Sequence, residues 1–299
     1  MSASDYTPPV SQLLTCGRPK ATRCSQWPNY VEEYGLTAAD VPDLIQLAVE
    51  DELDWDDDIE CYAPIHACRA LGQLRAEPAI QAMIALLADR DNDWFMEELP
   101  VIFGMIGPAS IPPLSIYLNS TEPSIWSKVA ASGGLEQIAV RHPEHRDECV
   151  GLITDVLSHH QHQPPELNGN LVGRLLDLQA VEAVDVIEKA YKEGPMDEMV
   201  CGSWARVQIE LGLATADDFT EEELRHKEPE WMDSIKAIAA LRELSQQEVS
   251  ATPKLTAVGS KLSQFGRGSL STKGRKSSQA KSGFGTQPPQ RKKKRTRKR

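Results

Sequence analysis

The sequence predicts an all-α protein, organised as a right-handed α-solenoid of antiparallel helical pairs and followed by a disordered tail. Apolar residues recur at helical spacing along most of the chain, and no β-branched alternation competes with them. Similar helix–corner–helix stretches return roughly every 30–40 residues, the period of helical repeat proteins. We therefore divide the chain into an irregular lead-in (1–36), a repeat array (37–246) and a basic tail (247–299).

The lead-in contains four prolines and little periodicity. One short helix is expected near Val10–Leu14. The aromatic residues Trp27, Tyr30 and Tyr34 are expected to cover the first helical pair.

The first helix of the array is expected to start after Thr37. Thr37 and Asp40 have the three-residue spacing of a helix cap, and an apolar-periodic run from Val41 to Val49 follows. Pro42 lies in the first turn, where the missing backbone N–H is tolerated.

Four further helices are predicted after the acidic linker Asp51–Glu60. They cover Tyr62–Leu74, Glu77–Ala88, Trp94–Ile106 and Ile111–Leu118. The stretch Ala67–Leu87 is the clearest copy of the repeat, and Gly72 is expected to form its corner.

Comparison of the corners identifies the other copies. Leu71–Leu74, Phe103–Ile106 and Leu175–Leu178 each end an apolar helix before a small-residue corner, and a looser copy runs from Leu135 to Leu157. One more helix is expected over Met196–Leu213, then a polar loop over 215–229 and a terminal helix over Trp231–Leu244.

The corner residues carry a resemblance to a known family. Ala67–Leu74 reads A-x-x-A-L-G-x-L and is followed by a second apolar stripe at Ala79–Leu87. This pattern resembles HEAT-like repeats, specifically the short bacterial type found in phycobilisome (bilin) lyases. The segments Glu97–Pro100 and Ile106–Leu114 also look like those of cyanobacterial HEAT-repeat proteins.

The resemblance covers Asp40–Leu213 and implies an α-solenoid with a protein-interaction role. It transfers no catalytic residue to this chain, and no bilin-attachment motif is visible. An accessory role in bilin attachment or phycobilisome assembly is implied by the resemblance alone.

The charge of the chain is sharply divided. Residues 251–299 hold 15 of the 32 Lys and Arg residues and no Asp or Glu, so the first 250 residues carry 17 basic and all 44 acidic residues, a net charge of −27. The tail lacks the apolar side chains needed to offset the entropy of ordering. Its terminal run is the predicted site for an anionic partner: Arg291, Lys292, Lys293, Lys294, Arg295, Arg297, Lys298 and Arg299.

Several partners suit a tail of this charge. Nucleic acid or a ribosome would bind it through counterion release, and anionic lipid would attract it as well. The tail is also suited to an acidic protein, or to the acidic body of its own chain. The blandest alternative is a solubilising segment without a partner.

Other constellations have ordinary structural explanations. The six cysteines have no metal or disulfide spacing, and Cys61 and Cys68 are expected in the core. His66 is expected to be buried and hydrogen-bonded. His159, His160 and His162 are expected in a polar connector.

The sequence contains no nucleophile motif, phosphate loop or zinc motif, so no catalytic residue, metal site or cofactor is predicted. Glu97 and Glu98 form a carboxylate pair without further support for catalysis. The acidic segments Asp51–Glu60 and Asp89–Asp93 lack the calcium-loop pattern and are expected to be solvated.

The sequence thus favours a non-enzymatic scaffold or adaptor that binds a protein on its helical surface. Exposed tryptophans are expected to anchor such a partner, and the sequence does not select among Trp55, Trp94, Trp126, Trp204 and Trp231. A nucleic-acid-associated protein driven by the tail is the alternative. Without an apolar run of membrane length or a signal-peptide pattern, a cytoplasmic location is expected.

Overall fold

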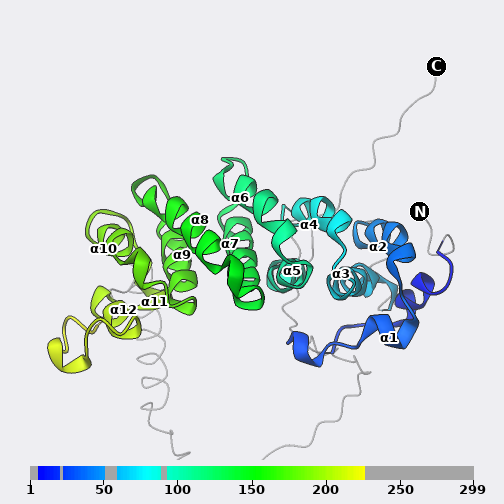
Figure 1. The fold of residues 1–299 in the computed structure, drawn as a ribbon, viewed down its shortest axis with the longest axis horizontal. Helices are drawn as coiled ribbons and strands as arrows, with labels where there is room; N and C mark the ends of the chain where they lie inside the picture. Colours follow the sequence, from blue (N-terminus) through cyan, green and yellow to red (C-terminus); the bar gives the residue numbers. More distant parts are fainter. Residues whose placement is uncertain (1–5, 21–22, 51–58, 89–92, 226–299) are drawn as a thin grey trace, which may run out of the picture. The chain divides into compact units, whose positions relative to one another are not determined.

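A computed structural model describes residues 6–20, 23–50, 59–88 and 93–225 of the chain. These residues form helices joined by short connections, and no β-strand occurs among them (Figure 1). The α-helices are α1 (Tyr30–Tyr34), α2 (Val41–Ala48), α3 (Ala63–Gln73), α4 (Ile80–Leu86), α5 (Asp93–Ile106), α6 (Ile111–Asn119), α7 (Ile125–Arg141), α8 (Arg146–Ser158), α9 (Pro165–Asp177), α10 (Val184–Glu193), α11 (Glu198–Cys201) and α12 (Trp204–Glu210).

Short 3₁₀ turns accompany these helices. They are η2 (Val10–Thr15), η3 (Cys24–Gln26), η4 (Ala38–Asp40), η5 (Glu60–Tyr62), η6 (Glu77–Ala79), η7 (Pro108–Ser110), η8 (Pro143–His145), η9 (His160–His162), η10 (Val181–Ala183) and η11 (Ala216–Asp218). The prediction of an all-α protein is confirmed for the described residues. The predicted helix Trp231–Leu244, the tail 247–299 and most of the acidic linker lie outside them, and the domain boundaries stay predictions.

The helices from α3 to α11 fall into two alternating rows. In one row α3, α5, α7, α9 and α11 each contact the next, and in the other row α4, α6, α8 and α10 do the same (Figure 1). Contacts of α6 with α7, α7 with α8, and α8 with α9 join the rows. From α3 to α11, these contacts therefore join helices that are one or two places apart in the order of the chain.

The predicted repeat corners share one hydrogen-bonding pattern at two positions 104 residues apart. Arg75 (φ 52°) and Gln179 (φ 49°) both adopt the left-handed conformation. The N–H of Ala76 donates to the carbonyl of Leu71 at 3.0 Å, and the N–H of Ala180 donates to that of Leu175 at 2.9 Å. Both are Schellman helix ends, in which a left-handed residue lets the last carbonyls find donors.

Gly72 was expected to form this corner, and that prediction is wrong. Gly72 lies inside α3, where a Cβ atom would be 3.2 Å from Cγ2 of Ile102 and 3.3 Å from Sδ of Met105. Its small size instead lets α3 and α5 pack closely, and Arg75 makes the turn.

The helices that return after the corners begin alike. A 3₁₀ turn precedes each of α4, α6, α8 and α10, and Pro78, Pro108 and Pro143 lie in three of these turns. Proline suits a first turn because the N–H groups there have no intrahelical acceptor. In these three corners the proline therefore marks the start of the next helix.

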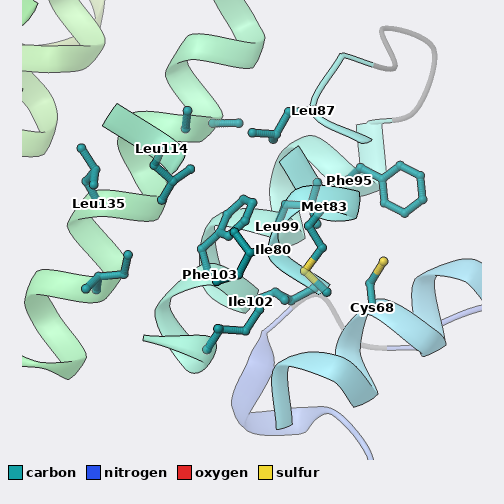
Figure 2. Close-up of a cluster of buried hydrophobic side chains, with 14 of the residues drawn as sticks. Cys68, Ile80, Met83, Leu87, Phe95, Leu99, Ile102, Phe103, Leu114 and Leu135 are labelled. Atoms are coloured by element: carbon teal, nitrogen blue, oxygen red, sulfur yellow. The ribbon is translucent and has the colours of Figure 1, made fainter. Parts of the chain in front are cut away.

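The hydrophobic core is continuous from one pair to the next. Met83 of α4, Phe103 of α5, Leu114 of α6 and Leu135 of α7 are all fully buried and belong to one cluster (Figure 2). Because the two rows contribute alternately, each pair completes the core of its neighbour. Burial of these side chains supplies the main stabilisation, about 2 kcal/mol for each large residue.

Glycines bring α5 and α7 unusually close. A Cβ atom at Gly104 would lie 2.7 Å from Cβ and 2.9 Å from the carbonyl oxygen of Gln137. One turn earlier on α7, a Cβ at Gly134 would lie 3.0 Å from Leu114 of α6 and 3.3 Å from Phe103 of α5. The two helices therefore run past each other with almost no side-chain spacer at this point.

The N-terminal segment is held on α3 by a stripe of polar side chains at helical spacing. His66 is 4% exposed, and its ring nitrogens contact the Tyr30 hydroxyl at 2.6 Å and the Gly17 carbonyl at 2.7 Å. One turn further, the Arg69 guanidinium lies 4.5 Å from the ring centroid of Trp27. The predicted burial of His66 and the covering role of Trp27 and Tyr30 are confirmed.

Arg69 also forms a buried ion pair with Glu98 of α5. Its Nε donates to Oε2 of Glu98 at 2.7 Å, and a second bond joins Nη2 to the other carboxylate oxygen. Glu98 therefore joins α3 to α5 and is not one half of a catalytic carboxylate pair with Glu97. Burial raises the pKa of Glu98, and the Arg69 charge opposes that shift.

The prediction of a single helix over Met196–Leu213 is wrong. Two short helices, α11 and α12, replace it, because Gly202 (φ 80°) breaks the chain between them. A Cβ at Gly202 would lie 2.6 Å from Cδ of Arg206, so glycine fits both the conformation and the space.

A candidate binding groove on helices α5, α7 and α9

A groove of about 860 Å³ runs across three successive helices of the α3–α11 row. Helix α5 forms one wall, α7 forms the floor, and Arg174 of α9 closes one end. The groove is lined by Met96, Glu97, Pro100, Val101, Ser124, Ile125, Trp126, Val129, Ala130, Gly133, Glu136, Gln137 and Arg174. We refer to these residues as the α5–α7–α9 groove.

The floor follows from the helical period of α7. Ile125, Val129, Gly133 and Gln137 are spaced by four residues, so they share one face of the helix. Ser124 fixes the start of that face, since its hydroxyl accepts a hydrogen bond from the N–H of Ser127 at 3.1 Å. The sequence of α7 thus turns an apolar stripe with a glycine toward the groove.

The absence of a side chain at Gly133 deepens the floor of the groove. A Cβ atom there would lie 3.4 Å from Pro100 of α5 and 3.5 Å from Nη2 of Arg174. Pro100 sits inside α5, where it also removes one helical donor. A small residue facing a compact ring leaves space that longer side chains would fill.

Trp126 is the most exposed apolar side chain of the groove. It is 59% exposed, whereas Trp27 is 8% exposed. A tryptophan exposed to this extent beside an apolar groove leaves a large area available to a partner, and tryptophan is enriched among residues that dominate binding energy. Among the described tryptophans, the structure therefore identifies Trp126 as the exposed one, a choice that the sequence alone did not make.

The polar end of the groove is an ion pair between α7 and α9. Nη1 of Arg174 donates to Oε2 of Glu136 at 2.8 Å, and Glu136 is 8% exposed. Burial raises the pKa of Glu136, while the Arg174 charge counteracts the shift. Nε of Arg174 is buried without an acceptor in the described chain, so one donor remains unsatisfied there.

Glu97 is exposed at the side of the groove that α5 forms. The charges of Glu136 and Arg174 cancel. The net charge of the lining is therefore −1, from Glu97. The arrangement suits an apolar or aromatic side chain with a cation nearby, because the apolar surface and the carboxylate each gain a partner.

The structure also locates the other predicted site residues. The basic run Arg291–Arg299, which carries the anionic-partner prediction, lies outside the described residues. Cys61 and Cys68 are buried as expected. Cys149 is buried as well, and burial raises its pKa to about 11. Within the described ranges, no group of three potential metal ligands is close enough to hold an ion.

The three histidines of the predicted polar connector differ in solvent exposure. His160 is 2% exposed and packs beside Gly194, while His159 and His162 face solvent. His160 therefore serves the fold, since its carbonyl accepts a hydrogen bond from the buried Asn168 at 2.9 Å.

Sequence reasoning missed the groove, although one signal was present. The pair Gly133–Gly134 in the middle of a long apolar helix is costly for helix stability and indicates close packing or function. It gives no information on Arg174, which pairs with Glu136 from 38 residues further along the chain.

Comparisons with protein-family models, with curated proteins and with solved structures return no significant match for this chain. The resemblance to HEAT-like repeats therefore stays a prediction. None of the helices in the described part of the chain combines the length and apolar character needed to cross a bilayer.

Proposed function

We propose that the helical pairs stack as a HEAT-like α-solenoid, and that the protein is a non-enzymatic scaffold that binds a protein partner in the α5–α7–α9 groove. The favoured ligand is a short peptide segment with an aromatic anchor and a nearby Lys or Arg. The observation that carries this proposal is the exposed Trp126 beside an open apolar groove.

Three observations support the stacking. Each helix of a row contacts the next helix of the same row, the corners at Arg75 and Gln179 share one geometry, and the core continues between pairs. Stacked repeats build extended surfaces that suit binding more than chemistry.

The energetics favour an anchored peptide. Burying an aromatic side chain against Trp126, Ile125 and Val129 removes apolar surface from water on both partners. A cation near Glu97 adds selectivity and speeds association more than it adds affinity. The groove floor is built on a 17-residue helix, so little ordering of the scaffold opposes binding.

Selection from a displayed peptide library, with the full-length chain as bait, tests the proposal. The selected peptides should contain an aromatic residue with a nearby Lys or Arg. Trp126→Ala should weaken their binding at least about 30-fold, because truncation of a central anchor costs about 2 kcal/mol. Ile116→Ala is the matched control, since Ile116 is 74% exposed on α6 and outside the groove.

Two results would contradict the proposal. Peptides that bind the Trp126→Ala chain as tightly as the wild type do not use the groove. Equal losses for Trp126→Ala and Ile116→Ala indicate general adhesion to exposed apolar residues.

Nucleic-acid binding by the tail is a second candidate, favoured by eight cations in the last nine residues. Replacement of those eight by glutamine in the full chain should weaken binding to RNA and flatten its dependence on salt. Unchanged binding at low salt would remove this candidate. The bilin-attachment hypothesis stays a prediction from the resemblance.

A further inference from the structure

A second cavity, of about 740 Å³, lies where helices α3, α5 and α7 end. These three helices are consecutive members of one row (Figure 1), and residues of α1 and of the segment before it supply the remaining wall. The lining includes Trp27, Glu32, Arg75, Gly104, Met105 and Arg141. We refer to this site as the α3–α5–α7 cavity.

The cavity begins where the α5–α7–α9 groove ends. On α7, Gly133 and Gln137 line the groove, and Arg141, four residues further along, lines the cavity. Residues four apart follow one ridge of a helix. On α5, Gly104 lines the cavity and packs directly on Gln137 of the groove, since a Cβ atom at Gly104 would lie 2.7 Å from Cβ of Gln137. The two sites are therefore neighbours along the contact between α5 and α7.

The cavity carries two cations, Arg75 and Arg141. Both are exposed, and neither forms an ion pair within the described part of the chain. Nη2 of Arg141 donates to Sγ of Cys24 at 3.5 Å, and a thiol sulfur is only a weak acceptor. With Glu32 included, the lining has a net charge of +1, whereas the first 250 residues carry −27. The cavity is thus a cationic site on an acidic body.

Trp27 adds a buried hydrogen-bond donor to this lining. It is 8% exposed, and its Nε1–H has no acceptor among the described residues. The indole and guanidinium groups can only donate. Because a buried donor without a partner is unfavourable, a ligand gains by bringing acceptor oxygens to the cavity. A carboxylate offers two such oxygens and pairs with a guanidinium in a bidentate manner.

The three helix ends moderate the preference for an anion. Each carboxyl end carries about half a negative charge, so together the ends offset most of the field of the two guanidinium groups. Affinity for an anion then depends on direct hydrogen bonds rather than on long-range attraction. We therefore expect each arginine to change the affinity about 10-fold, as one charge-assisted hydrogen-bonded pair does.

The distance between the two sites determines the length of a ligand that reaches both. Arg141 follows Trp126 by 15 residues within α7, a rise of about 22 Å. An extended peptide covers that distance in about seven residues. One short segment can therefore place an aromatic anchor at Trp126 and a carboxylate at Arg75 and Arg141.

We propose that the α3–α5–α7 cavity is a second subsite for the same partner segment, and that it binds the side-chain carboxylate of an Asp or Glu about seven residues from the aromatic anchor. The inference rests on the proposed function of the groove. The partner motif then has two parts, an aromatic residue with a nearby cation and an acidic residue further along. Joining two weak contacts in one segment raises the affinity and sets the register of the peptide.

The displayed-library selection on the full-length chain tests the spacing. Peptides that depend on Trp126 should carry Asp or Glu roughly five to nine residues from their aromatic residue more often than at other distances. Arg141→Gln should weaken their binding about 10-fold, and Arg75→Gln should weaken it as well. Lys189→Gln is the matched control, because it removes the same charge from α10, where the side chain is 61% exposed and outside both sites. It should leave the binding unchanged.

A double-mutant cycle separates direct contact from a structural effect of the substitution. Replacement of the acidic residue of a selected peptide by its amide should weaken binding to the wild type about 10-fold, and should cost nothing further in Arg141→Gln. Additive losses would show that Arg141 does not contact the carboxylate, and they would overturn the proposal.

The outcomes distinguish the two proposals. If binding depends on Trp126 while no acidic position is selected and Arg141→Gln changes nothing, the second subsite is refuted and the groove function stands. If no selected peptide depends on Trp126, the groove function fails and the second subsite fails with it. Peptides that depend on Arg75 and Arg141 without Trp126 would refute a ligand shared by both sites, because the cavity would then bind acidic peptides by itself.

Discussion

At the scale of single residues, His66 shows how a polar side chain in an apolar helix joins two segments. The Gly17 carbonyl can only accept, so Nε2 carries the proton of the neutral ring and Nδ1 accepts from the Tyr30 hydroxyl. Burial lowers the pKa of His66 below its usual 6.5, the nearby Arg69 charge lowers it further, and the Gly17 bond opposes both.

This arrangement predicts a loss of stability in mild acid. Below pH 6.5 the unfolded chain binds a proton at His66 that the folded chain resists, so the free energy of unfolding falls as the pH drops through this value. It levels off below the folded-state pKa. Urea midpoints at pH 7.5 and 5.5 should therefore fall more in the wild type than in His66→Gln.

The same comparison supplies its control at pH 7.5. There His66→Gln should cost about 1–3 kcal/mol, since one of the buried partners of the ring loses its hydrogen bond. An equal fall in midpoint for both chains between pH 7.5 and 5.5 would show that other groups dominate the acid response.

Single residues also show which structural properties the sequence could predict and which it could not. The burial of His66 followed from its position on an apolar face. The partnership of Arg69 with Glu98 did not, because the two are 29 residues apart and each is unremarkable alone. Trp126 could not be distinguished from the other tryptophans, since exposure depends on which neighbours the fold supplies.

At the scale of helices, the packing of α5 on α7 depends on glycine. The sequence predicted α2 to α6 close to their observed bounds, because apolar spacing and prolines determine them locally, but it missed α1 and the break at Gly202. It misassigned Gly72, because a glycine next to the last residue of a helix fits a corner and a helix crossing equally well. Only the tertiary contact with Ile102 and Met105 decides between them.

Substitution of Gly104 tests this packing. Gly104→Ala places a methyl group 2.7 Å from Cβ of Gln137, so the helices must separate, and we expect a loss of about 1–3 kcal/mol in unfolding free energy. Gly151→Ala is the matched control inside α8. Nothing lies within 4 Å of its Cβ position, and the change should stabilise by about 0.5–1 kcal/mol.

Thermal or urea unfolding of both variants measures the difference. Stabilisation by Gly104→Ala, or equal effects at the two positions, would mean that α5 and α7 do not approach as closely as described.

At the scale of the whole array, the proposed solenoid predicts that the destabilisation caused by a substitution stays near the substituted helices. Each pair contacts mainly its neighbours, so stability is a sum of local contributions. In Gly104→Ala, amide exchange should rise about 10-fold in α5, α6 and α7 and much less in α9 and α10. A uniform rise from α3 to α12 would contradict stacked repeats and indicate one cooperative core.

The array also explains why the sequence predicted the helical fold but did not predict the groove. The repeat pattern reports what each pair shares, namely corners, apolar stripes and small residues. A binding surface arises where three successive helices differ from that pattern, at Pro100, Gly133 and Arg174. Those departures gain meaning only when the helices are placed side by side.

The most direct measurement for the central claim is an amide-exchange footprint of a selected aromatic–basic peptide on the full-length chain. Slower exchange is expected at the start of α7, over residues 125–133, and in α5 over 96–101, with no protection of α6 around Ile116. Protection centred elsewhere, or none at saturating peptide, would contradict the assignment of the α5–α7–α9 groove as the binding surface.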